Sequence, residues 1–400
     1  MTIPPGISPP RIPRTVWALG LVSLLMDTSS EIVHALLPLF MTVQLGLSVA
    51  MLGLIDGVAE ATASITKLFS GYISDRIGRR KPLILIGYGL AAVTKPVFAI
   101  AGSAGLVFGA RFADRIGKGL RGAPRDALIA DVTSPELRGR AFGLRQSLDT
   151  VGAFAGPLLA VGLMLILAND IRTIFWIATI PAAFAVFVIL FGVRDVDAPL
   201  TANPRVPLRF ADVRKLPDAY WAVVALGTVL TLARFSEAFL ILKANAEDLP
   251  LALTPLVLVV MNLVYAAGAY PAGHFSDRML PMRLLGLGIA CLIAADLVLA
   301  MASGMAGVTL GLVLWGGHMA LTQGLLAKLV ADRAPSDLRG SAFGLFNLAT
   351  GIALLLASVI AGLLWDRFGA DATFFAGAGF AAVALLLVSR YPKRAQSEPA

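Results

Sequence analysis

The sequence predicts an all-α polytopic membrane protein with twelve transmembrane helices in two parallel, pseudo-symmetric six-helix bundles. Three observations carry this prediction. Of the 400 residues, 58% are hydrophobic and only 14% are charged, whereas a soluble protein has roughly 25% charged residues. Long apolar runs recur along the whole chain, for example at 82–100, 174–193 and 374–388, as expected of membrane-spanning helices. Finally, motifs of the first half return in the second half.

Short polar breaks divide the chain into twelve approximate spans. In the first half these are 15–43, 49–72, 82–101, 104–130, 141–168 and 173–193. In the second half they are 219–242, 251–274, 284–302, 306–331, 340–365 and 371–389. A proline-containing segment of mixed charge separates the halves and is predicted to be a linker. The expected domains are therefore an N-terminal bundle, 1–193, a cytoplasmic linker, 194–218, and a C-terminal bundle, 219–400.

Lysines and arginines outside the spans fall almost entirely on one side of this map. The opposite side has only Arg172, Lys243 and Arg367. Because short loops rich in these residues stay in the cytosol, we expect both termini to be cytoplasmic and the protein to lie in the cytoplasmic (inner) membrane. The start of the chain lacks a signal-peptide cleavage pattern, so we expect the first span to be retained. The net charge of +8 then reflects lysines and arginines kept on the cytoplasmic side of the lipid bilayer, and we expect no binding to nucleic acid.

Two motifs recur between the halves. GYISDR at 71–76 returns as GHFSDR at 273–278, and LRGRAFGL at 137–144 returns as LRGSAFGL at 338–345, both about 200 residues later. Each copy lies on the cytoplasmic side of its half in the predicted topology. The repeats are therefore parallel, and a pseudo-two-fold axis along the membrane normal would relate them.

The first of these motifs is part of a longer signature between the second and third spans. It reads G-x-x-x-D-R-x-G-R-R and consists of Gly71, Asp75, Arg76, Gly78, Arg79 and Arg80. This pattern resembles the signature of the major facilitator superfamily (MFS), and its shorter copy is Gly273, Asp277 and Arg278. The resemblance covers essentially the whole chain and implies the MFS fold and a functional monomer. We predict a conformational latch, in which Asp75 meets a helix N-terminus or an arginine in one state only. The alternative is a loop that only sets topology.

Two further motifs resemble the superfamily less closely. The segment 111–119 resembles the helix-four pattern R-F-x-x-G-x-G-x-G, but Arg115 replaces a glycine and Lys118 a small residue. The helix-five pattern G-x-x-x-G-P-x-x-G is represented by Gly152, Gly156, Pro157 and, in place of the last glycine, Ala160. Because the second pattern is associated with antiporters, the resemblance implies an exporter-like, drug/proton antiporter-like branch.

Charged residues inside the spans are the candidate functional residues. An ionised side chain at the bilayer centre costs roughly 2.5–3.5 kcal/mol, so these residues must pair, become neutral, line a water-filled cavity or lie near the span ends. The superfamily resemblance implies a cavity lined or flanked by helices 1, 2, 4, 5, 7, 8, 10 and 11. The candidates on these helices are Asp27, Glu31, Asp56, Glu60, Arg111, Asp114, Arg115, Lys118, Arg145, Asp149, Arg234 and Glu237. For the bases of the fourth helix and the acids of helices one, two and five, pairs that merely hold the N-terminal half together are the alternative.

Asp27 and Glu31 are the sharpest candidates for proton coupling. They lie one helical turn apart and repel each other when both are ionised, so one of them is expected to bind a proton. We predict that Arg111 or Arg115 is their partner. The second half of the fourth span is expected to differ: Arg121, Arg125 and Asp126 would lie mostly in water at the cytoplasmic end. Its glycines Gly117, Gly119 and Gly122 would permit close helix packing.

The sequence thus predicts a secondary transporter that moves a small solute by alternating access, with protons as the coupling ion and export by antiport. No nucleotide-binding P-loop is present, so an ion gradient would supply the energy. Two alternatives stay open: an uptake symporter for an organic anion, metal or metal chelate, and a transporter-like sensor without flux. The near balance of acids and bases in the N-terminal half leaves the charge of the solute open. No enzyme motif, no cofactor and, with Cys291 as the only cysteine, no Cys-based metal site is expected.

Overall fold

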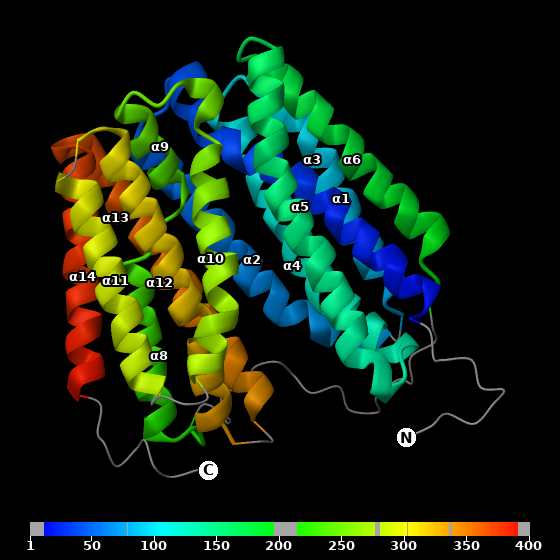
Figure 1. Ribbon diagram of the computed structural model, residues 1–400. Helices are drawn as coiled ribbons and strands as arrows, with labels where there is room; N and C mark the ends of the chain where they lie inside the picture. Colours follow the sequence, from blue (N-terminus) through cyan, green and yellow to red (C-terminus); the bar gives the residue numbers. More distant parts are fainter. Residues whose placement is uncertain are drawn as a thin grey trace.

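A computed structural model describes residues 12–77, 79–195, 214–276, 281–301, 303–335 and 338–390, and these residues form helices and short connections. The side chains of residues 75, 136, 270, 273–276, 281, 324, 339 and 340 lie outside the description. Arg14, where the first helix begins, and Arg390, where the last one ends, lie at the same end of the molecule (Figure 1). We call this the terminal end and the opposite end the far end.

The helices of the first half run alternately between the two ends. They are α1 (Arg14–Leu39), extended by a π-helical turn η1 (Phe40–Gln44), α2 (Val49–Ile77), α3 (Lys81–Ile100), α4 (Ala104–Val132), α5 (Arg138–Ile166) and α6 (Ile171–Gly192). A short 3-10 turn, η2 (Pro135–Leu137), precedes α5. Ser103 caps α4 by accepting a hydrogen bond from the Leu106 N–H, and Asp170 caps α6 in the same way from Thr173.

The second half repeats this arrangement with one interruption. Its helices are α8 (Asp218–Leu232), α9 (Ala238–Ala246), α10 (Leu256–Ser276), α11 (Pro281–Met301), α12 (Gly304–Arg333), α13 (Arg339–Phe368) and α14 (Ala370–Arg390), with a 3-10 turn η3 (Leu251–Leu253). The packing partners correspond: α3 lies against α4 and α6, as α11 lies against α12 and α14, and α2 lies against α4, as α10 lies against α12. The two six-helix bundles are therefore parallel and pseudo-symmetric.

Ten helices of the described chain are long and apolar enough to cross a membrane. The fourth span is too charged for that criterion and the seventh is too short, because the seventh span, expected as one helix over 219–242, is broken between α8 and α9. Thr228 and Thr231 turn their hydroxyls back onto the carbonyls of Val224 and Gly227, a local bond that competes with helix propagation. Beyond the break, the Ser236 hydroxyl accepts the Ala238 N–H at 3.2 Å and restarts the helix.

Glycines let the charged helix α4 pack as a span. A Cβ at Gly117 would lie 2.5 Å from the Gly87 carbonyl oxygen of α3, and one at Gly119 would lie 2.5 Å from the Thr66 side chain of α2. Both positions therefore need glycine for the helices to approach. The expectation for Gly122 was wrong, because a Cβ there would meet nothing within 4 Å.

The two halves meet most closely where α2 crosses α13. A Cβ at Gly53 would collide with the Ser358 carbonyl oxygen, and one at Gly362 would lie 2.7 Å from Ala50. At the far end of this crossing, the Asp366 carboxylate accepts the backbone N–H groups of Val49 at 3.0 Å and Ala50 at 2.9 Å. A charged cap on the first turn of α2 thus joins the halves at the far end.

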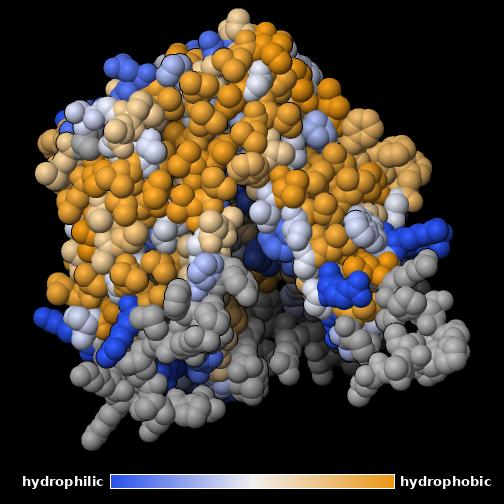
Figure 2. Space-filling view, viewed as in Figure 1, coloured by the Kyte–Doolittle hydropathy of each residue, from blue (hydrophilic) through white to orange (hydrophobic). Residues whose placement is uncertain are grey.

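Toward the terminal end the halves separate. Figure 2 shows a hollow between two apolar flanks, with hydrophilic side chains inside it. Exposed apolar side chains such as Phe184, Phe187 and Phe191 of α6 lie on the outer surface, which suits a lipid environment. The fold therefore places its polar residues inward, around a central cavity.

Candidate functional site

A cavity of about 480 Å³ lies between the two halves. The first half contributes α1, α2, α4 and α5, and the second half contributes α8, the break after it, α10, α12 and α13. The lining residues are Glu31, His34, Glu60, Ser64, Arg115, Lys118, Ala153, Thr231, Arg234, Phe235, Ser236, Glu237, Asn262, Trp315, Thr350, Gly351 and Leu354. Charges of both signs and two aromatic rings thus face one space.

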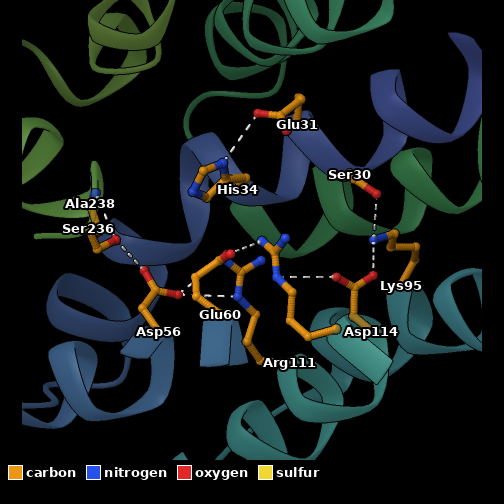
Figure 3. Close-up of polar contacts among 11 residues, drawn as sticks. Ser30, Glu31, His34, Asp56, Glu60, Lys95, Arg111, Asp114, Ser236 and Ala238 are labelled. Carbon is orange, nitrogen blue, oxygen red and sulfur yellow. Dashed lines mark hydrogen bonds and ion pairs between the residues drawn. The ribbon is translucent and has the colours of Figure 1, made fainter. Parts of the chain in front are cut away.

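The first half of α4 holds a row of ion pairs beside this cavity (Figure 3). The Arg111 guanidinium donates to Asp56 of α2, with Nη2 at 3.1 Å and Nε at 3.2 Å from Oδ1. Arg115 Nη2 lies 3.2 Å from Glu60 Oε1, also on α2. Both arginines thus lie beside the cavity and pair with acids of α2.

Asp114, between the two arginines, points to the other side of α4. Its Oδ1 accepts a hydrogen bond from Lys95 Nζ at 2.9 Å, and the same ammonium donates to the Ser30 hydroxyl at 3.1 Å. Lys95 is only 1% exposed. The candidate set omitted Lys95 because it lies on the third helix, outside the set expected to line the cavity. Asp114, the acid of the R-F-A-D segment, needs a cationic partner inside the membrane. That need was the signal that could have pointed to Lys95.

The second half of α4 is drier than expected. Arg121 is only 5% exposed and its guanidinium lies 4.5 Å above the Tyr88 ring. Arg125 donates to the hydroxyls of Ser23 and Tyr88 at 3.1 and 3.2 Å, and to Asp126 at 3.1 Å. The expectation that Arg121 and Arg125 lie mostly in water was therefore wrong. The reason is that α1 and α3 extend alongside α4 far enough to cover both side chains.

Asp27 and Glu31 have different partners from those expected. Asp27 lies 3.9 Å from Arg121 and also interacts with the Asp149 carboxyl of α5. Glu31 lines the cavity and accepts a hydrogen bond from the His34 ring at 3.2 Å. Within 4 Å in the described chain, neither carboxylate contacts Arg111 or Arg115, because both arginines are turned toward α2.

Asp149 of α5 lies close to a base of its own helix and to a base of α4. It lies 3.6 Å from Arg145, one turn earlier, and 4.0 Å from Arg125 of α4. The helix-five glycines bring α5 against α1 at this level: a Cβ at Gly152 would lie 2.5 Å from the Leu24 carbonyl oxygen, and one at Gly156 would lie 2.6 Å from the Glu31 Cβ. Pro157 follows them and is buried.

The second half presents its polar groups at the break between α8 and α9. Arg234 and Glu237, the candidates on the seventh span, both line the cavity. Ser236, which the sequence analysis missed, donates its hydroxyl to Asp56 Oδ2 at 2.8 Å and so joins the halves across the cavity. The sequence pattern does not single out this serine. Its role depends on the helix break, which the polar residues between two apolar runs indicate only weakly.

The predicted latch is described only in part. Arg80 donates to the Ser74 hydroxyl at 2.8 Å and to Asp131 of α4 at 3.4 Å, and Asp195 accepts the Arg80 N–H at 3.2 Å. A Cβ at Gly71 would lie 3.5 Å from the Ala123 side chain, an ordinary contact, and Arg76 and Arg79 are exposed. The Asp75 side chain, Gly78, Asp277 and Arg278, and the surroundings of Gly273, lie outside the described residues. The latch stays a prediction.

Two acidic groups outside the spans show ordinary cap chemistry. The hydroxyl and N–H of Thr173 lower the pKa of Asp170, and the Gly304 N–H, together with Lys243, lowers the pKa of Glu247. Within the described residues, no group of three or more His, Cys, Asp or Glu side chains is arranged to hold a metal ion.

Sequence comparisons identify the family, and a structure comparison matches the fold. The profile described as Major Facilitator Superfamily matches residues 19–358 and 256–400. The uncharacterized MFS-type transporter MJ1317 of Methanocaldococcus jannaschii is 30% identical over 383 residues, covering 94% of each chain. Multidrug resistance protein MdtH of Salmonella newport is 26% identical, covering 81% of this chain and 79% of its own. Among solved structures, the nucleoside transporter NupG matches with a TM-score of 0.79 at 14% identity, covering 94% of this chain and 100% of that one.

Proposed function

The chain belongs to the Major Facilitator Superfamily, and we propose that it exports a small solute by antiport with protons, through alternating access of its two halves. The family and these relatives make it a multi-pass membrane transporter rather than an enzyme. One observation carries the finer proposal: two of the carboxylates that line the central cavity already have basic partners. Glu60 lies 3.2 Å from Arg115, and Glu31 lies 3.2 Å from His34. A proton and a solute therefore compete for the same charges.

The competition follows from elementary electrostatics. A proton on Glu60 removes the carboxylate charge that holds Arg115, so a solute that needs the ionised Glu60–Arg115 pair cannot be bound at the same time. Asp27 and Asp149 offer a second proton site, because two interacting carboxyls repel when both are ionised and are suited to hold one proton between them. Asp27 and Glu31 remain the main coupling carboxylates of the proposal, and Arg121 and His34 replace the expected partners.

The direction of transport rests on sidedness. Positive loops at the terminal end favour a cytosolic position for it, so the cavity would receive its solute from the cytosol across an inner membrane. The relative named a multidrug resistance protein and the helix-five glycines support export. Release on the far side would require Asp366 to leave the first turn of α2 and Ser236 to leave Asp56.

The remaining parts of the proposal concern organisation. The halves 1–193 and 219–400 would rock as bodies joined by the linker 194–218, with the 71–80 and 273–278 motifs as latches at the terminal end. We propose that the monomer is the functional unit.

Proton-driven flux from reconstituted vesicles tests the function. A resistance screen across drugs, metals and chelates first supplies a transported solute, and an imposed pH gradient should then drive its export. Asp27→Asn and Glu31→Gln are each expected to slow this flux at least ten-fold and flatten its pH dependence. Asp248→Asn is the matched control, because Asp248 is exposed and its positive φ of 64° suits asparagine.

The outcomes separate the alternatives. Wild-type flux and unchanged pH dependence in both Asp27→Asn and Glu31→Gln would remove these carboxylates from coupling. Solute uptake with protons in the same direction would indicate the symporter. The absence of flux for every solute would favour a sensor.

A further inference from the structure

The charged groups on the cavity wall divide into matched and unmatched ones. Glu31 and His34 form one pair and Glu60 and Arg115 another, each at 3.2 Å. Three other charged residues line the same cavity: Lys118, Arg234 and Glu237. For these three, no hydrogen bond or ion pair within 4 Å exists among the described residues. The unmatched groups are therefore two cations and one carboxylate.

The two unmatched cations come from different halves. Lys118 lies on α4, one turn beyond Arg115, and its side chain is exposed to the cavity. Arg234 lies in the break between α8 and α9, three residues before Glu237. Glu237 is the acid that acts most strongly on Arg234 and offsets part of its charge. Glu60, Glu31 and Asp27 act on Lys118 from beyond 4 Å in the same way, so two cations and one carboxylate remain without a close partner.

The wall beside Arg234 is aromatic. Phe235 and Trp315 line the cavity, with ring centroids 5.5 Å apart, and Phe235 also packs at 5.5 Å against Phe374. These contacts fix both rings in place. A rigid aromatic surface beside a cation suits a ligand that has an apolar body and an acidic group.

We infer that the cavity binds an amphipathic organic anion, held by Lys118 of one half and Arg234 of the other, with its apolar body against Phe235 and Trp315. This inference rests on the proposed transport function and names its substrate class. Counting all acids and bases left the charge of the solute open, whereas the charged groups without a partner within 4 Å favour an anion. The carboxylates that could receive a cationic solute are engaged, except for Glu237. An anion contacting both halves would also couple its own binding to their relative position.

Three probes with one ring system test the charge preference: 1-naphthoate, 1-naphthylmethanol and 1-naphthylmethylamine. Equilibrium binding to the purified full-length protein is measured at one pH for all three. The naphthoate is expected to bind at least ten-fold more tightly than the alcohol, and the amine more weakly than both, because a charge-assisted contact is lost and then replaced by repulsion.

Variants with opposite expected signs separate a binding role from a structural one. Lys118→Met and Arg234→Met should each weaken naphthoate binding about ten-fold or more while leaving the alcohol unchanged. Lys118→Arg should retain most of the affinity, and Glu237→Gln should strengthen it several-fold by removing the repelling charge. Arg390→Met is the control, because Arg390 is exposed at the end of α14, outside the cavity. A merely destabilised variant would lose the alcohol as well.

The result that overturns the inference is equal binding of the three probes, binding of none, or naphthoate affinity that is indifferent to Lys118 and Arg234. Flux measurements keep this failure distinct from that of the proposed function. Proton-driven export of the amine or alcohol, with the naphthoate excluded, would reject the anion and retain the antiporter. Tight, Lys118-dependent naphthoate binding without any proton-driven flux would retain the anion site and reject the antiporter.

Discussion

The two halves of the molecule share one helix arrangement and differ in how they treat charge. In the first half, acids and bases are neighbours, as in the pairs Asp114–Lys95 at 2.9 Å and Arg111–Asp56 at 3.1 Å. In the second half, Asp296 of α11 is fully buried, and neither carboxyl oxygen has a hydrogen-bond partner among the described residues. The difference shows that two halves can repeat the same helix arrangement without repeating its charged pairs. One half is a charge network and the other is largely an apolar wall with polar groups at a helix break.

Breaking a pair in the first half should have the largest effect. Asp114→Asn leaves the Lys95 ammonium buried without a carboxylate, and we expect a loss of about 3–5 kcal/mol in the free energy of unfolding. Denaturant unfolding in detergent measures it. The double variant Lys95→Met, Asp114→Leu should recover most of the loss, because it removes both charges together. A single variant as stable as the wild type would show that this pair does not hold the half together.

The same kind of change in the second half should have the opposite sign. Asp296→Leu removes a carboxyl that has no partner in the described chain and leaves an apolar side chain of similar size. We expect the free energy of unfolding to stay unchanged or to rise by up to about 2 kcal/mol. If unfolding became as easy as in Asp114→Asn, the contrast between the halves would fail at this position.

Asp366 tests the contact between the halves rather than either half. Asp366→Asn removes the negative charge from the first turn of α2, which is worth about 0.5–1 kcal/mol, and should shift the population toward an open far end by about two- to five-fold. The measurement is the labelling rate of Thr231→Cys, which lines the cavity, by a membrane-impermeant thiol reagent in a Cys291→Ala background. Unchanged labelling from the far side would mean that this cap does not bias the two states.

Asp170 provides the smallest effect and the matched comparison for Asp366. Its carboxylate caps α6 within one half, through the N–H and hydroxyl of Thr173 at 3.2 and 2.5 Å. Asp170→Ala should cost about 0.5–1 kcal/mol of stability and leave Thr231→Cys labelling unchanged. Because Thr173 lowers the pKa of Asp170, the contribution is present above the ordinary aspartate pKa and is lost as the pH falls through the lowered value. A stability difference independent of acid pH would contradict this origin.

Much of the fold was predictable because apolar length and loop charge are local properties. Span positions followed from them, whereas the repeat and the resemblance to the superfamily came from the recurring motifs, and even α4 was placed as a span despite its charges. The break in helix seven was missed, since Arg234 to Glu237 interrupt an apolar run without a glycine or proline. The partners of Asp27 and Glu31 were also wrong. Helical spacing tells which side chains share a face, but not which neighbouring helix that face meets.

By itself, the sequence determined a chain of twelve spans in two repeated halves, because burial in lipid demands long apolar helices. The motifs added the resemblance to a family of transporters. The sequence also showed that the first half is rich in charges. Only the tertiary structure decided which charges are already matched. Ion pairing acts over a few ångströms between helices far apart in the sequence, so Lys118 and Arg234 stand out from the other cations only after the helices are packed.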